Sequence, residues 1–287
     1  MVIFLNINQA LMKAYNILKA AGIDTYMLDA QLLLQKVLNK DKLFITINRD
    51  FEISLEEEKE YFHMIELRKN KMPVKYILGE CEFMGLNFNV REGVLIPRPD
   101  TEILVEEVIE RIKESNYREI CDVCCGSGVI GISIGRLVEN TRVYCYDISD
   151  MACQITEENI NKLGVQDKVN IFKSDLLDEA IIKDRKFDAV VSNPPYIKKE
   201  VISALMDDVK NYEPHIALDG GKDGLDFYRK ITEQSLQVLN KGGLLAFEIG
   251  YDQGEEVQAI LRDKGFTDIK CIKDLAGLNR VVTGIRS

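Results

Sequence analysis

The second half of the chain alternates short apolar segments with amphipathic ones, and this alternation restricts the possible folds more than any other feature. From about Thr101 onward, apolar stretches of strand length are separated by stretches whose apolar residues follow helical spacing. The predicted strands lie near 119–124, 142–147, 168–173, 187–192, 244–249, 267–272 and 280–285, and the predicted helices around 101–114, 128–138, 151–163, 224–239 and 253–264. This order predicts parallel βαβ units, which bind ligands at the carboxyl ends of their strands.

The N-terminal region has a different pattern. From about Asn8 to Lys71 the apolar residues recur mainly at helical spacing, which predicts a small helical domain. Residues 76–98 then form short β-like pieces separated by glycines, which predicts a hairpin. We therefore expect three parts, which are a helical domain over 1–75, a β-hairpin connector over 76–100 and an α/β domain over 101–287.

The composition is that of an acidic globular protein. Hydrophobic side chains make up 46% of the 287 residues, enough for a sizeable core. Asp and Glu outnumber Lys and Arg by 47 to 37, and the net charge of -10 argues against a large phosphate-binding surface. The sequence shows no signal peptide or membrane span, and its 7 cysteines and 2 histidines suggest neither a disulfide framework nor a complete metal site. We expect a cytoplasmic protein.

A glycine-rich turn follows the first strand of the α/β region. The segment DVCCGSG at 122–128 leads from this strand into a helix, and Asp147 ends the next strand. Backbone can approach a ligand closely at such a turn, and an acid on the second strand can accept hydrogen bonds from ribose hydroxyls. The spacing of Gly126, Gly128 and Gly131 also matches the dinucleotide fingerprint, so the turn alone does not identify the cofactor.

Asp122 favours a cationic ligand over a dinucleotide. Its carboxylate lies two residues before the turn, where it could hold an amine but would repel a pyrophosphate. S-Adenosylmethionine carries an ammonium and a sulfonium, so an acidic pocket suits it. The alternative role of Asp122 is to cap amides of the local backbone.

The segment FDAVVSNPPYIK at 187–198 joins a predicted strand to Asn193, Pro194, Pro195 and Tyr196. Proline has no N–H and a fixed φ, so the pair ends the strand and stiffens the chain. The side-chain carbonyl of Asn193 and the backbone carbonyl of Pro194 could then accept both hydrogens of a planar NH₂ group, beside the flat ring of Tyr196. Such contacts would orient the nitrogen for methyl transfer without a strong base. A tight turn capped by Asn is the alternative.

Together these segments resemble the bacterial protein-(glutamine-N5) methyltransferases that modify peptide chain release factors. The resemblance extends over the full length and includes IPRPDTE at 96–102, DVCCGSG at 122–128, SNPPYI at 192–197, EPHIALDGGKDGLDFYRKI at 213–231 and DLAGLNRVV at 274–282. The Asn-Pro-Pro-Tyr tetrapeptide is shared with DNA adenine and rRNA guanine N-methyltransferases, whereas the IPRPDTE and Glu-Pro segments are more specific.

The resemblance implies a Rossmann-like, seven-stranded methyltransferase domain that uses S-adenosyl-L-methionine and releases S-adenosyl-L-homocysteine. The implied acceptor is the glutamine of a release factor's Gly-Gly-Gln motif, held by Asn193, Pro194, Pro195 and Tyr196. The residues implied to bind the cofactor are Asp122, Cys124, Cys125, Gly126, Ser127, Gly128, Asp147, Asp175, Leu176 and Asn193, with Ser174 beside them. Arg98 and Thr101 lie in the IPRPDTE segment, which is implied to close over the site.

Three residues depart from the family pattern. Cys124 stands where many members have glycine, which puts in doubt any contact that needs a left-handed backbone there. Leu176 stands where some relatives have an aromatic residue, and Asn279 replaces a common aspartate before Arg280. None of these changes breaks the assignment.

For partners we expect release factors recognised by the N-terminal helices, with no metal, membrane or stable nucleic-acid complex, and a monomeric enzyme. The first alternative is a nucleic-acid amino-methyltransferase acting on adenine or guanine, which needs phosphate contacts. Its basic cluster at residues 68, 69, 71 and 75 could equally be a solvated helix end. A dinucleotide-dependent oxidoreductase leaves the proline pair unexplained. An inactive interaction module conflicts with the intact Asn193 and Tyr196.

Overall fold

The computed structural model describes residues 4–287, which divide into two compact units. The first unit contains the chain up to Glu80 together with Met206–Tyr212, and the second contains Cys81–Leu205 and Glu213–Ser287. The boundary follows residue 80 rather than residue 75, because helix α5 (Val74–Leu78) packs against helices α2 and α4 of the first unit. The local sequence pattern gave no indication that Met206–Tyr212 belongs to this unit.

The first unit is helical, as its sequence pattern predicts. Its helices are α1 (Ile7–Ala20), α2 (Tyr26–Leu38), α3 (Lys42–Ile47), α4 (Leu55–Lys69), α5 and α10 (Asp207–Tyr212). Asn6 and Ser54 begin α1 and α4 with capping boxes, in which the side chains of Gln9 and Glu57 bond back to the cap backbone. Apolar side chains from α1, α2 and α4 form the core of the unit.

The basic cluster at the end of α4 is largely paired within the first unit. Arg68 Nε donates to Asp29 Oδ2 at 2.7 Å, and these two side chains are only 8% and 4% exposed. Lys69 pairs with Glu66 at 2.9 Å, and Lys71 Nζ donates to two backbone carbonyls after α1. Three of the four cations therefore have partners, which supports a structural role for the cluster over a phosphate-binding one.

A short hairpin lies near the start of the second unit. Strands β1 (Glu80–Phe83) and β2 (Leu86–Asn89) pair with one another. Met84 and Gly85 connect them, with φ values of 52° and 71°. Two successive positive φ values are those of a type I′ turn, which matches the twist of a hairpin. The hairpin is shorter than predicted, because residues 90–100 form neither helix nor strand.

A seven-stranded sheet forms the centre of the second unit, as predicted. Its strands, taken over residues 4–287, are β3 (Glu119–Val123), β4 (Arg142–Asp147), β5 (Val169–Lys173), β6 (Phe187–Ser192), β7 (Leu239–Glu248), β8 (Phe266–Lys273) and β9 (Asn279–Arg286), in the order β5-β4-β3-β6-β7-β9-β8. Strands β3 to β7 pair in parallel. Strand β9 is antiparallel to β7 and β8. No helix separates β8 from β9, and a short connection joins antiparallel neighbours.

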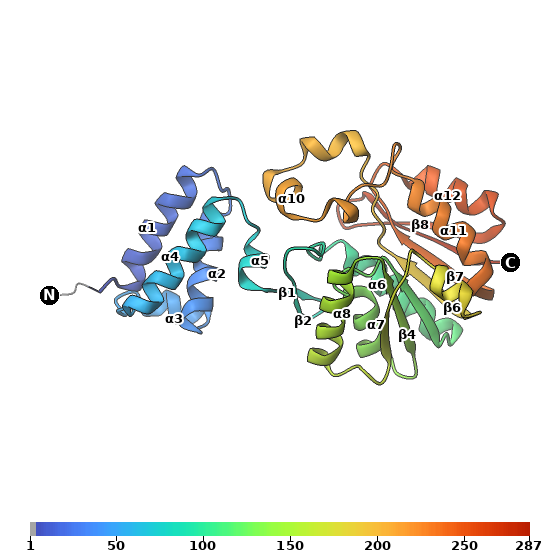
Figure 1. The fold of residues 1–287 in the computed structure, drawn as a ribbon, viewed down its shortest axis with the longest axis horizontal. Helices are drawn as coiled ribbons and strands as arrows, with labels where there is room; N and C mark the ends of the chain where they lie inside the picture. The colour runs from blue at the N-terminus through green and yellow to red at the C-terminus, as the bar shows by residue number, and fades with distance from the viewer. Residues whose placement is uncertain (1–3) are drawn as a thin grey trace. The chain divides into compact units, whose positions relative to one another are not determined.

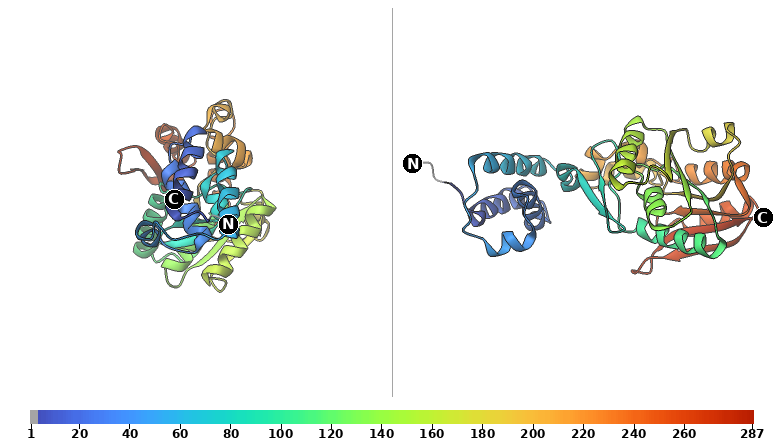
Figure 2. Two further views of the ribbon diagram at one scale, coloured as in Figure 1. Left: turned by 90° about the vertical axis from the view of Figure 1, so that its left-hand side faces the viewer. Right: turned by 90° about the horizontal axis from the view of Figure 1, so that it is seen from below.

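Helices cover both faces of this sheet (Figure 1, Figure 2). The first core cluster contains residues of α6 (Thr101–Ser115), α7 (Val129–Leu137) and α8 (Asp150–Leu163), and the second contains residues of α9 (Asp178–Ile182), α11 (Asp226–Val238) and α12 (Gly254–Asp263). Along β7, Leu244 and Ala246 belong to the first cluster, whereas Leu245 and Phe247 belong to the second. Successive strand residues thus point to opposite faces, and both faces are buried.

The strand order determines where a ligand can bind. Strand β3 lies between β4 and β6, so the connections that follow β3 and β6 leave the sheet on opposite sides of a crevice at their carboxyl ends. The sequence did not indicate α9 or two 3₁₀ segments, Lys199–Ala204 and His215–Ala217. Within residues 4–287, no helix is both long enough and apolar enough to cross a membrane.

Candidate active site

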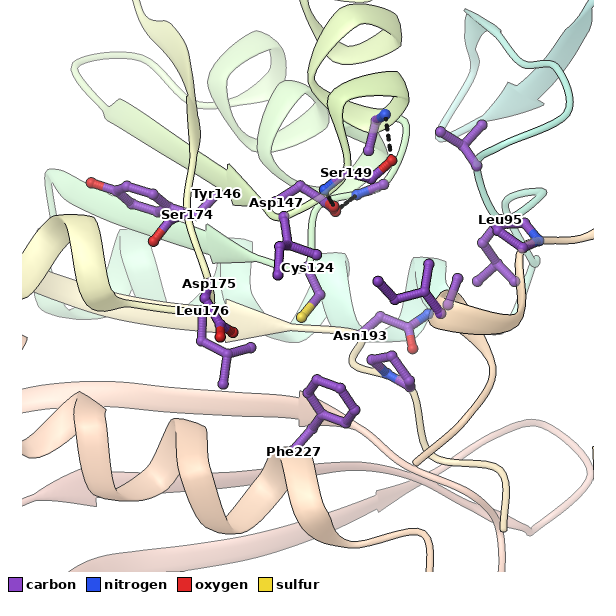
Figure 3. A pocket seen from close by; sticks show the side chains of 18 of the residues that line it. Leu95, Cys124, Tyr146, Asp147, Ser149, Ser174, Asp175, Leu176, Asn193 and Phe227 are labelled. Carbon is purple, nitrogen blue, oxygen red and sulfur yellow. Dashed lines mark hydrogen bonds between the residues drawn. The ribbon is translucent and has the colours of Figure 1, made fainter. Parts of the chain in front are cut away.

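A cavity lies at the carboxyl ends of β3, β4, β5 and β6, where the sequence predicts a ligand site (Figure 3). Its empty space, counted together with its open mouth, is about 880 Å³. The predicted site residues that line it are Cys124, Gly126, Asp147, Asp175, Leu176, Asn193 and Pro195, with Ser174. Folding therefore brings together four loops that are far apart in the sequence.

A smaller recess adjoins this cavity and shares four of its lining residues, Leu95, Cys124, Gly126 and Asn193. The recess is also lined by Pro97, Arg98, Thr101, Cys125, Ser127, Val129 and Ile130. The IPRPDTE segment and the glycine turn thus border the same space. Asn193 contributes to both cavities, so a group bound in one could meet a group bound in the other at this side chain.

The glycine turn has a left-handed backbone at three positions. The φ values of Cys124, Gly126 and Gly128 are 59°, 58° and 79°. At Gly128 an added Cβ would lie 2.8 Å from two side chains, whereas at Gly126 it would meet nothing within 4 Å. Cys124 therefore adopts the conformation that the loss of glycine had put in doubt, although a side chain in this region costs roughly 1–2 kcal/mol.

Asp147 ends β4 and lines the cavity. Its Oδ2 accepts a hydrogen bond from the Gly126 amide at 2.9 Å, and its Oδ1 accepts one from the Ser149 amide at 2.9 Å (Figure 3). Burial raises the pKa of Asp147, and these amide hydrogen bonds oppose that effect. Two amides thus fix the carboxylate, and each oxygen keeps a lone pair for the hydroxyls of a ribose.

Asp122 lines neither cavity. Its side chain is 0% exposed, and its Oδ2 accepts from the Gly131 amide in α7 at 2.8 Å. Burial raises the pKa of Asp122 to about 7, and Oδ1 has no hydrogen-bond partner within residues 4–287. The structure therefore favours the capping role of Asp122 over contact with a ligand amine, because the carboxylate faces helix α7.

An aromatic ring that the sequence did not single out lines the cavity. Phe227 of α11 points into it (Figure 3), and Leu176 lines it with a φ of 49°. Tyr146 of β4 lines the same space. Phe227 thus supplies an aromatic surface to the same pocket that Leu176 lines. Phe227 lies inside the EPHIALDGGKDGLDFYRKI segment, but amphipathic helical spacing was a sufficient explanation for a phenylalanine there.

Strand β6 leads directly into the Asn-Pro-Pro-Tyr segment. Asn193 and Pro195 line the cavity, whereas Pro194 and Tyr196 do not. The side-chain nitrogen of Asn193 donates to Thr101 Oγ1 at 3.3 Å, which connects the segment to the first turn of α6. Of the four residues predicted to hold a substrate amide, Asn193 is therefore the one with a side-chain polar group at the cavity.

Arg98 connects two of the segments that surround the site. It forms an ion pair with Glu213, whose side chain is 1% exposed. Glu213 also accepts a hydrogen bond from the Ile96 amide at 3.4 Å. The segment that follows Glu213 reaches the cavity through Pro214, Ile216 and Ala217. The pair therefore joins the IPRPDTE segment to one wall of the cavity.

The remaining lining residues came from no sequence motif that we had assigned to the site. They are Gly93, Val94, Ile148, Ser149, Ala152 and Lys230. The cysteines of the glycine turn are free thiols, and burial raises the pKa of Cys124 and Cys125. Within residues 4–287, no group of three or more His, Cys, Asp or Glu side chains is arranged to hold a metal ion.

Proteins similar in sequence cover nearly the whole chain. The release factor glutamine methyltransferase of Clostridium botulinum is 62% identical over 272 residues, which are 95% of this chain and 96% of the relative. That of Clostridium acetobutylicum is 52% identical over 282 residues, which are 98% of this chain and 99% of the relative. Residues 9–79 match the family described as PrmC N-terminal domain, and residues 99–211 match the methyltransferase small domain.

Solved structures share the fold at low sequence identity. The hMettl16 catalytic domain in complex with the MAT2A 3'UTR hairpin 6 aligns with a TM-score of 0.58 and 15% identity, covering 82% of this chain and 83% of that one. The T. thermophilus 16S rRNA methyltransferase RsmC in complex with AdoMet and guanosine aligns with a TM-score of 0.52 and 17% identity, covering 72% of this chain and 50% of that one. At such identities the likeness concerns the fold alone.

Proposed function

We infer the function from one premise, which is that this chain belongs to the release factor glutamine methyltransferase family and is a methyltransferase. We propose that it transfers a methyl group from S-adenosylmethionine to the side-chain amide nitrogen (N5) of the glutamine in the Gly-Gly-Gln motif of peptide chain release factors. The observation that carries the proposal is the position of Asn193, a polar amide shared by the main cavity and the recess beside it.

The main cavity fits S-adenosylmethionine, which supplies an electrophilic methyl group on a sulfonium when bound. Asp147 would hold the ribose hydroxyls with a carboxylate that two amides already orient. Leu176 and Phe227 offer apolar surfaces to the adenine ring. The open backbone around Gly126 leaves room for the amino-acid end of the cofactor. Ser174, Asp175 and Cys124 complete the set that we propose to bind it.

Asn193 would orient the substrate amide. The lone pair of an amide nitrogen is delocalised, so the reaction depends on aiming this nitrogen at the methyl carbon. The carbonyl oxygen of Asn193 would accept one N–H of the glutamine, and the backbone carbonyl of Pro194 would accept the other. These contacts would stabilise the charge that develops on nitrogen as the N–C bond forms and the methyl–sulfonium bond breaks to leave S-adenosylhomocysteine, and the nitrogen would then lose a proton to water.

We propose that the helical unit recognises the folded release factor, because a short motif offers too little area for specific binding. The enzyme would act as a monomer in the cytoplasm, where translation termination takes place. The nucleic-acid alternative is not favoured, because partners within the first unit already occupy three of the four cations in the basic cluster.

Mass spectrometry tests the proposal directly. We expect the purified chain with S-adenosylmethionine and a folded release factor to add one methyl mass to the Gly-Gly-Gln peptide. Asn193→Ala should lower the transfer rate about 10²–10³-fold, as loss of an oriented hydrogen-bond group does, while calorimetry shows retained cofactor binding. Asn170→Ala, an exposed position on β5, is the matched control. An unmodified release factor, with label transferred to DNA or RNA instead, would contradict the proposal.

A further inference from the structure

Glu248 is a buried acid that the proposed reaction does not use. It is the last residue of β7, and its side chain is 1% exposed. Strands β6 and β7 pair in a register that places Ser192 beside Phe247, so Glu248 follows on beside Asn193 at the same edge of the sheet. Acids are rarely buried unless they are paired. The position of Glu248 behind Asn193 therefore needs an explanation.

The side chains of Asn193 and Thr101 lie close enough to the Glu248 carboxylate for hydrogen bonding to lower its pKa. Thr101 is the first residue of α6, and its side chain is buried. Asn193 Nδ2 also donates to Thr101 Oγ1 at 3.3 Å. The three side chains are thus neighbours at this edge of the sheet. The Oε2 atom of Glu248 has no hydrogen-bond partner within residues 4–287.

Donor and acceptor rules fix the polarity of this arrangement. An ionised carboxylate can only accept hydrogen bonds, and a threonine hydroxyl has a single hydrogen to donate. A Thr101 hydroxyl that accepts from the NH₂ group of Asn193 therefore keeps its own hydrogen for Glu248, and the second NH₂ hydrogen of Asn193 would be directed at the carboxylate. Only the carbonyl oxygen of Asn193 remains for the cavity. This matters because the two ends of an asparagine amide have nearly the same shape, so packing does not choose between them.

We propose that ionised Glu248, together with Thr101, is a positioning residue that keeps the carbonyl oxygen of Asn193 directed at the substrate amide. The inference rests on the proposed function, since it takes Asn193 as the acceptor for the glutamine N–H. A protonated Glu248 would donate to Thr101, and the Thr101 hydrogen would then be free to bond the Asn193 oxygen. The amide would turn over and present its NH₂ group to another NH₂ group, which cannot accept a hydrogen bond.

The surroundings of Glu248 place its protonation in a pH range that can be tested. Burial raises the pKa of Glu248 to about 7, its hydrogen bonds and the Arg280 guanidinium oppose this, and the Asp100 carboxylate adds to it. Tyr196 and Tyr228 also face Glu248, and burial raises the pKa of both phenols, so they stay neutral. We therefore expect kcat to fall as the pH is lowered through 7, with little change in cofactor affinity.

Substitutions at Glu248 and Thr101 test the inference with a folded release factor as substrate. Glu248→Gln and Thr101→Val should each lower kcat about 10–100-fold, as expected for losing one oriented hydrogen bond, and leave calorimetric affinity for S-adenosylmethionine unchanged. Thr101→Ser keeps the hydroxyl and should recover most of the activity. Thr283→Val is the matched control, because Thr283 is also buried and its hydroxyl has no hydrogen-bond partner within residues 4–287.

The pH profile separates positioning from a general loss of packing. Wild-type kcat should decrease from about pH 8 to about pH 6, whereas Glu248→Gln should show a low kcat with no such decrease. Wild-type kcat in Thr101→Val, or an unchanged pH profile in Glu248→Gln, would overturn the inference. If Glu248→Gln does not fold, the Thr101→Val and Thr101→Ser pair decides alone. Failure of the wild-type chain to methylate any release factor would instead overturn the proposed function.

Discussion

The two units of this protein accommodate buried charge differently. In the helical unit, Asp29 is paired with Arg68 at 2.7 Å, and Arg68 donates further to the backbone. In the methyltransferase unit, Asp122 and Glu248 each keep one carboxylate oxygen that has no hydrogen-bond partner within residues 4–287, and burial raises the pKa of both to about 7. Among the fully buried acids of residues 4–287, Asp29 and Glu213 are paired with arginines, and the two that are incompletely satisfied both lie in the unit that carries the cavity. This agrees with the clustering of perturbed pKa values at functional sites.

The largest effect on stability should come from breaking the buried ion pair of Asp29 and Arg68 in the helical unit. Arg68→Met leaves Asp29 buried without its cation, and we expect the free energy of unfolding of the helical unit to drop by about 3–5 kcal/mol. Urea unfolding followed by circular dichroism measures this. Lys69→Ala removes an exposed pair with Glu66 and should change the same quantity by less than about 1 kcal/mol. Equal unfolding midpoints for Arg68→Met and wild type would show that the buried pair contributes nothing.

The two incompletely satisfied acids of the methyltransferase unit, Asp122 and Glu248, predict that stability depends on pH. Unfolded Glu248 titrates near 4.5 and unfolded Asp122 near 3.8, but both hold their protons up to about pH 7 in the folded chain. The folded state binds more protons between these values, so the free energy of unfolding falls as the pH rises through this window, by on the order of 3 kcal/mol for each acid.

Urea midpoints measured from about pH 5 to about pH 8 would test this dependence. Glu248→Gln and Asp122→Asn remove the titrating groups, so each variant should show a flatter curve than wild type. The curve of the Arg68→Met variant should keep the wild-type slope in the methyltransferase transition. A Glu248→Gln variant with an undiminished slope would assign the pH dependence to other groups.

The smallest expected effect concerns backbone strain rather than charge. Cys124 in the glycine turn and Asn39 at the end of α2 have φ values of 59° and 49°. Asparagine tolerates the left-handed region and cysteine does not, so Cys124→Gly should raise the free energy of unfolding by about 1 kcal/mol, whereas Asn39→Gly should leave it nearly unchanged. Thermal unfolding of both variants would measure the difference. Destabilisation by Cys124→Gly would mean that the contacts of the thiol outweigh the strain.

The local sequence pattern predicted the bounds of single buried strands most reliably. The predicted strands near 142–147 and 187–192 match β4 and β6, because continuous apolar runs between turn residues have few alternatives. Strand β7 begins earlier than predicted, at Leu239, which pairs with Phe187 before an irregularity shifts the register so that Leu244 pairs with Ala189. The insertion of β9 between β7 and β8 had no local signal at all.

The sequence by itself determined the family, the alternation of strands and helices, and the motifs that meet at the cavity, because all of these depend on residues near one another in the chain. Only the tertiary structure decided which way the Asp122 carboxylate faces, and that Phe227 enters the cavity. It also decided that Glu248 lies behind Asn193. An acid at the end of LLAFE looks like any strand terminus until the sheet register and helix α6 bring Thr101 and Asn193 to it. Which of these side chains donates and which accepts depends on all of them together, so no single segment of the sequence encodes it.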